Sequence, residues 1–156
     1  MDLPPPAEPH WLANADAFAA FITAWEQGRL PKRDWTHAAH VAVGACYAVR
    51  FGPGALDRLR EGILRYNAAV GTPNTDTSGY HETLTRFWAA VLAAETAGLA
   101  DEWDAARRAV TRFGHRRDLH LQYYVADPMP SPPARRHWHP PDAPGVTWPP
   151  AVAQAR

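Results

Sequence analysis

The sequence DWTHAAHVAVGACYAVR, residues 34–50, carries the pattern that sets the fold class. Its apolar side chains recur every three or four residues, which is the spacing of one face of an α-helix. The members of this row are Ala38, Val41, Ala45 and Val49. Asp34 has a side chain suited to capping a helix, and the sequence GPG at residues 52–54 interrupts the pattern. We therefore predict a helix that begins after Asp34 and ends near Arg50.

The same periodicity predicts most of the remaining chain to be helical. The other predicted helices span residues 14–27, 55–69, 78–96 and 101–113, and residues 117–124 are compatible with a short sixth helix. Thirteen of the sixteen prolines lie within residues 4–9 and 128–150, where they disfavour helix. We therefore predict an all-α, single-domain bundle of five to six helices. An extended segment (1–13) precedes the helical domain (14–127), and a proline-rich tail (128–156) packs on it.

Composition narrows the classes of partner. The 156 residues suit one domain, and sixteen basic residues balance sixteen acidic ones, so net charge gives no reason to expect nucleic acid or an anionic membrane surface. No apolar run approaches the ~20 residues of a membrane span. Cys46 is the single cysteine, which excludes an intrachain disulfide and a thiolate metal cage. We expect a cytoplasmic protein without a membrane or nucleic-acid partner, whose oligomeric state is open and compatible with a homodimer.

Two short motifs place histidines where packing alone does not require them. WTHAAH, residues 35–40, holds His37 and His40 three positions apart, on one side of a helix. GYHET, residues 79–83, places His81 at the head of an apolar row. If Asp34 and Ser78 cap the two helices, His37 and His81 lie in first turns, where the helix dipole disfavours imidazolium. A neutral imidazole is what a metal ligand or a general base requires.

These residues leave several chemistries open. His37, His40 and His81, with Glu82, would suit zinc, iron, nickel or copper, or would act as acid and base without a metal. The structural alternatives are a histidine bonded to a backbone carbonyl and a glutamate that complements the helix dipole. The sequence HETLT lacks the second histidine of an HExxH zinc motif, because Thr85 stands in its place.

Four neighbouring residues are candidates for binding a substrate. Trp35 and Tyr80 precede the histidines and would form part of the wall of a pocket, although packing in the aromatic core is an alternative role. Asn67 and Arg86 would position the substrate. The alternatives are a turn contact for Asn67 and, for Arg86, an ion pair with Glu82 four residues earlier.

The order of the motifs resembles a group of small, mostly uncharacterised bacterial all-α proteins. Their pattern is W-T-H-x-x-H, then Y-N, then G-Y-H-E-T, then S-x-x-A-R and P-D. The corresponding segments of this chain are residues 35–40, 66–67, 79–83, 131–135 and 141–142. The resemblance covers roughly residues 18–142 and implies an all-α fold, but it implies no activity. This chain departs from the pattern in the tail, where prolines replace apolar residues.

These observations predict a small-molecule enzyme of the lyase, isomerase or hydrolase type. Its reaction would be an elimination, isomerisation, cyclisation or hydrolysis of a small polar substrate. A non-catalytic module that binds a ligand or metal is the alternative, and a purely structural helical protein is the third. We further predict that the three imidazoles share one cavity, and that Trp138 or Trp148 packs on the bundle and helps to close it.

Overall fold

The computed structural model describes residues 3–4 and 7–152, and the regular secondary structure of this part is helical. Its α-helices are α1 (Ala15–Glu26), α2 (His37–Phe51), α3 (Ala55–Val70), α4 (Glu82–Thr96), α5 (Glu102–Phe113) and α6 (Pro132–Arg136). Short 3-10 turns form at His10–Leu12, Lys32–Asp34, Gly52–Gly54 and Leu119–Gln122. The prediction of an all-α fold is confirmed. None of the described helices is long and apolar enough to cross a membrane.

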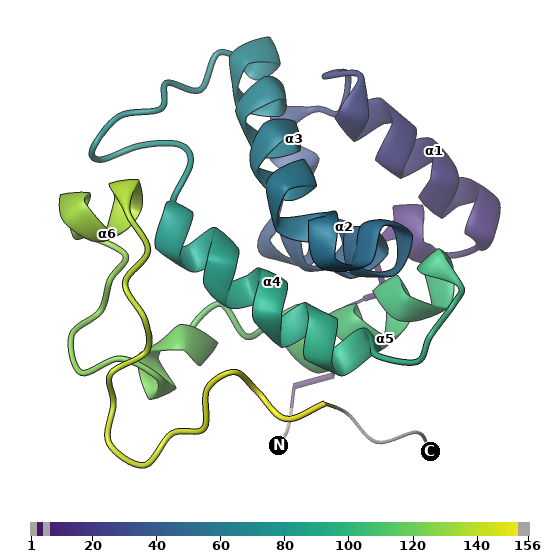
Figure 1. The fold of residues 1–156 in the computed structure, drawn as a ribbon. Coiled ribbons are helices and arrows are strands. Elements are labelled where there is room, and N and C mark those ends of the chain that lie inside the picture. The colour runs from purple at the N-terminus through teal and green to yellow at the C-terminus, as the bar shows by residue number, and fades with distance from the viewer. Residues whose placement is uncertain (1–2, 5–6, 153–156) are drawn as a thin grey trace.

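Helix α2 is the centre of the arrangement. It packs against α3, α4 and α5, and Figure 1 shows α4 below α2, with α3 and α1 above it. Every residue from position 41 to position 47 is buried, so α2 meets neighbours on all sides. Gly44 permits the approach of α4, because a Cβ atom there would overlap with the side chain of Leu92.

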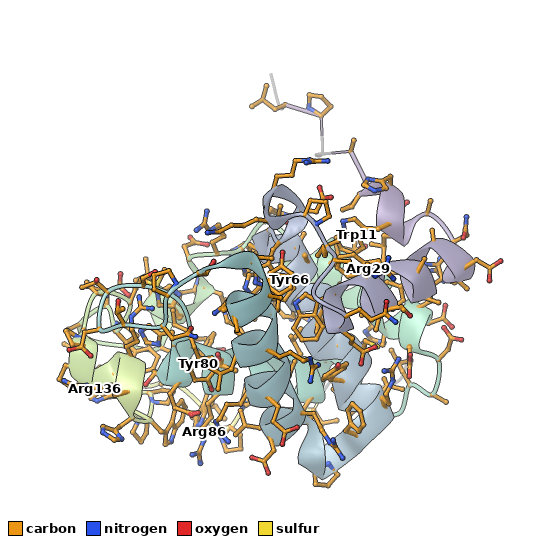
Figure 2. The ribbon with its side chains drawn as sticks, turned by 90° about the horizontal axis from the view of Figure 1, so that it is seen from above. Trp11, Arg29, Tyr66, Tyr80, Arg86 and Arg136 are labelled. Atoms are coloured by element: carbon orange, nitrogen blue, oxygen red, sulfur yellow. The ribbon has the colours of Figure 1, made fainter. Side chains whose placement is uncertain are left out.

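Two apolar clusters share α2. One surrounds Trp25 and joins α1, α2 and α3 to the N-terminal 3-10 turn that carries Trp11. The other surrounds Phe87 and joins α2, α4 and α5 to the segments that follow them. Figure 2 shows Trp11 and Tyr66, both of the first cluster, with Arg136 of α6 at the far edge of the molecule.

Two predicted helix starts are wrong. Helix α2 begins at His37, and its N-cap is Thr36, whose hydroxyl accepts the Ala39 N–H at 3.2 Å; Asp34 belongs to the preceding 3-10 turn. Helix α4 begins at Glu82 rather than at residue 78 or 79. The reason lies in the preceding loop, because the side chain of Asn74 accepts the Tyr80 N–H at 2.9 Å and holds this loop out of the helix.

The proline-rich segment packs along α4. Thr83 donates to the His137 carbonyl at 2.9 Å and accepts the His139 N–H at 3.0 Å. Trp148 stacks on Phe87 with ring centroids 5.4 Å apart, and Figure 1 shows this segment, in yellow, running below α4. Neither Trp148 nor Trp138 lines the cavity described below, so the expectation that they close it is wrong.

Candidate functional site

A cavity of about 490 Å³ lies among α2, α3, α4 and the segments near residues 117–135. Its volume is within the range of cavities that bind small molecules, roughly 300–1,000 Å³. His37, His40 and His81 all line it, together with apolar side chains from the three helices. The cavity therefore brings together histidines that two separate motifs supply.

His37 presents one ring nitrogen that the protein does not use. Its Nε2–H donates to the Phe113 carbonyl at 3.0 Å, since a carbonyl can only accept. In the neutral ring Nδ1 then carries the lone pair, and it has no partner among the described residues and is not buried. Burial lowers the pKa of His37, and the charge of Arg117 acts in the same direction. His37 is therefore a neutral acceptor at pH 7.

His40 also has one ring nitrogen that the protein does not use, although its tautomer is the opposite of that of His37. Its Nδ1–H donates to the Thr36 carbonyl at 2.8 Å, which leaves Nε2 without a partner among the described residues. The ring lies on Trp35, with centroids 3.8 Å apart. The ring is exposed to the cavity yet surrounded by protein, and this burial lowers the pKa of His40 to about 4. Burial disfavours the charged imidazolium, so the ring is neutral at pH 7.

His81 lines the same cavity but has a structural role. It is the N-cap of α4, where its Nδ1 accepts the Leu84 N–H at 3.1 Å. Its Nε2–H donates to the Pro128 carbonyl at 3.0 Å. Because both ring nitrogens are engaged, His81 has no free lone pair for a metal or a proton. The geometry therefore contradicts the expected first-turn position and does not support a role as ligand or base.

Glu82 and Arg86 do not line the cavity. Two nitrogens of Arg60 donate to the Glu82 carboxylate, Nε at 2.9 Å and Nη2 at 2.7 Å from Oε1, and so join α3 to α4. The guanidinium of Arg86 lies 4.8 Å from the ring centroid of Trp138. The expected pairing of Glu82 with Arg86 is absent from the ion pairs of the described residues. Both side chains support the fold outside the site, in contrast to their expected catalytic and substrate-binding roles.

The other three expected binding residues line the cavity. Trp35 supports the His40 ring, and Asn67 donates to the Asn74 side chain at 3.0 Å. Tyr80 donates its hydroxyl to Glu82 at 2.9 Å, and burial together with this carboxylate raises the pKa of Tyr80 to about 12. Tyr80 therefore contributes its ring to the wall rather than an acidic proton.

His120 is a cavity residue that the sequence did not reveal. It is buried, and its Nε2–H donates to the Asp127 carboxylate at 3.0 Å. Its Nδ1 is buried with no hydrogen-bond partner among the described residues. A carboxylate that orients an imidazole in this way also fixes its tautomer. The seven-residue separation within an irregular segment gave no periodic signal that could have identified the pair.

The expected three-histidine metal site is not assembled. In the part of the chain that the structure describes, no group of three or more His, Cys, Asp or Glu side chains is arranged to hold an ion. His37 and His40 offer two free imidazole nitrogens, whereas catalytic zinc sites use three protein ligands. Binding of zinc, iron, nickel or copper stays a prediction that elemental analysis would test.

Comparisons with known proteins add no further assignment. No protein-family model matches the chain, and no curated protein or solved structure matches it. The resemblance to the bacterial WTHxxH and GYHET proteins therefore stays a prediction, and the functional conclusions rest on the cavity itself.

Proposed function

We propose that the protein is an enzyme that transfers a proton to or from a small molecule bound in this cavity, without a metal. One observation carries the proposal. His37 and His40 are each held by a backbone carbonyl through one nitrogen and have no partner for the other. Both line the same cavity and both are neutral at pH 7. A held, neutral imidazole beside a bound molecule is the usual arrangement of a general base.

His40 is the better candidate for the base, because it is exposed whereas His37 is only partly exposed. In both rings the bond to a backbone carbonyl, Thr36 for His40 and Phe113 for His37, stabilises the positive charge that forms when the free nitrogen takes a proton. The charge of Arg117 opposes that step at His37 and at His40. His120, oriented by Asp127, also lines the cavity, but its free Nδ1 is buried, so we assign it no part in the proton transfer. Elimination, isomerisation, cyclisation and hydrolysis all use a general base.

The alternative is a binding module that holds a ligand without changing it. Apolar side chains form much of the cavity wall, including Val41, Val43, Leu59, Ile63 and Leu92. Such a wall retains an apolar ligand through burial alone and does not require chemistry.

A turnover experiment separates the two functions. Purified protein would be incubated with a pool of small organic compounds, and mass spectrometry would identify any compound consumed. We expect consumption by the native protein and by the control His139→Gln, whose ring lies outside the cavity and contacts Asp142. His40→Phe, which keeps a ring against Trp35, should abolish it.

The other possible outcomes test the binding module, the assignment of the base and the absence of a metal. A compound that binds and stays unchanged would assign the protein as a binding module. Unchanged turnover in His40→Phe would contradict the assigned base. Turnover that disappears in a chelator, with stoichiometric metal in the native protein, would favour the metal-assisted reaction over the metal-free one.

A further inference from the structure

The charges that line the cavity all have the same sign. Lys32, Arg117 and Arg135 belong to its lining, whereas the lining contains no aspartate or glutamate. The chain as a whole has equal numbers of basic and acidic residues, so this segregation is a property of the cavity. Clefts lined by one sign of charge concentrate ligands of the opposite sign.

The cavity cations differ from their sequence neighbours. Arg116 forms an ion pair with Asp118 at 3.4 Å, and Arg136 forms one with Asp76 at 3.5 Å. Arg117 and Arg135, the adjacent residues, form no ion pair within the described part of the chain, and neither does Lys32. Of these four arginines, the two that line the cavity are therefore the two without an ion pair among the described residues, and their charge is available to another anion.

The two cavity arginines act on different parts of the wall. Arg117 lies close enough to His37 and His40 for its charge to oppose their protonation. Arg135 opposes protonation of His81 in the same way. The guanidinium of Arg135 is held in place, because its Nη1 donates to the Gly79 carbonyl at 2.8 Å. Its remaining donors are available to a ligand, in a geometry suited to carboxylate or phosphate oxygens.

Two helix starts add to the positive potential. Thr36 and His81, the N-caps of α2 and α4, both line the cavity. Helix N-termini carry partial positive charge, which reinforces the arginines without forming a site of its own.

The rest of the wall accommodates an apolar body. The indole rings of Trp35 and Trp88 line the cavity together with the aliphatic side chains named above. Trp88 also contacts the His37 ring edge, with centroids 5.1 Å apart. An apolar group bound here would therefore lie beside the imidazoles.

We propose that the ligand of this cavity is an organic anion, whose carboxylate or phosphate group is attracted by the charges of Arg117 and Arg135 and whose apolar, ring-sized body packs on the indole and aliphatic wall. The inference deepens the proposed function, since it takes the cavity as the substrate site. Burial is the main cause of the lowered pKa of His40, and an anion beside Arg117 offsets the smaller contribution of that charge.

The first test compares ligands of one shape and different charge. Phenylacetate, phenyl phosphate and the neutral phenylacetamide would be titrated into the full chain and followed by NMR at the indole N–H groups of Trp35 and Trp88. We expect at least one anion to bind about tenfold more tightly than phenylacetamide, which corresponds to ~1.4 kcal/mol. Its Kd should rise with salt, because ions screen the attraction. The tighter of the two anions identifies carboxylate or phosphate as the preferred group.

The second test uses neighbouring arginines as matched controls. Arg117→Gln and Arg135→Gln should each weaken binding of the preferred anion by about tenfold, again ~1.4 kcal/mol. Arg116→Gln and Arg136→Gln remove the same charge one residue away and should leave Kd within a factor of two. Arg136 lies on α6 at the outer edge of the molecule (Figure 2). If Arg135→Gln fails to fold, Arg117→Gln carries the test, because Arg117 is exposed and forms no ion pair among the described residues.

Three results would overturn the inference: equal affinity for phenylacetamide and the anions, unchanged affinity in Arg117→Gln, or no anion that shifts either indole signal. Each is distinct from failure of the proposed function. Anions that bind normally to a protein without turnover would contradict catalysis and leave the anion site standing. Turnover of a neutral compound, with no anion bound, would contradict the anion site and support catalysis.

Discussion

Replacement of His81 tests whether this residue belongs to the fold or to the chemistry. His81→Ala removes two interactions, the cap on the Leu84 N–H and the bond to the buried Pro128 carbonyl. Loss of an N-cap costs ~1 kcal/mol, and leaving a buried carbonyl unpaired costs about 1–3 kcal/mol. We therefore expect the free energy of unfolding to fall by about 2–4 kcal/mol. For a chain of this length each kcal/mol lowers Tm by about 2–4 °C.

His81→Asn separates the two contributions. The amide oxygen of asparagine takes the place of Nδ1 and is itself a favoured N-cap, whereas asparagine is too short to reach Pro128. We expect this variant to be ~1 kcal/mol more stable than His81→Ala in urea unfolding followed by tryptophan fluorescence. It should also bind the preferred anion with unchanged Kd. Equal stability of the two variants would refute the capping role. A folded His81→Asn protein that does not bind the anion would show that His81 is a binding residue.

Three further predictions concern stability. Burial lowers the pKa of His37, His40 and His81 in the folded state, so the unfolded chain takes up protons first; Tm should therefore be highest above about pH 6.5 and should fall between pH 6.5 and 5. A Tm that is constant over this range would contradict the burial of the three rings. Glu82→Gln weakens a partly buried ion pair with Arg60 and should lower the free energy of urea unfolding by about 1–2 kcal/mol, without change in anion affinity; loss of affinity at full stability would place Glu82 in the site. Gly44→Ala introduces a Cβ atom that overlaps with the Leu92 side chain, so we expect a lower Tm although alanine has the better helix propensity. A higher Tm would show that α2 and α4 are not in close contact.

The helical part of the fold could be predicted from short-range patterns. The apolar row of α3 and the cap at Asn14, which accepts the Ala17 N–H at 2.8 Å, are set within one or two turns of chain. The two helix starts that were wrong share a cause. Asp34 and Ser78 have side chains suited to capping, but Asp34 belongs to a 3-10 turn and Ser78 to the loop that Asn74 holds, so Thr36 and His81 are the caps. Local propensity names the candidates for a cap, and the entry of the preceding loop selects one.

The sequence alone determined that this chain is helical and that His37 and His40 lie on one side of one helix. The tertiary structure decided what the other polar groups do. The Pro128 carbonyl that engages His81 is 47 residues away, and the Phe113 carbonyl that fixes the His37 tautomer is 76 residues away. Arg117 and Arg135 come to the cavity from an irregular segment and a short helix without a shared motif. Helical periodicity records contacts between neighbours in sequence, whereas hydrogen-bond partners and the sign of charge in a cavity depend on which distant segments fold against it.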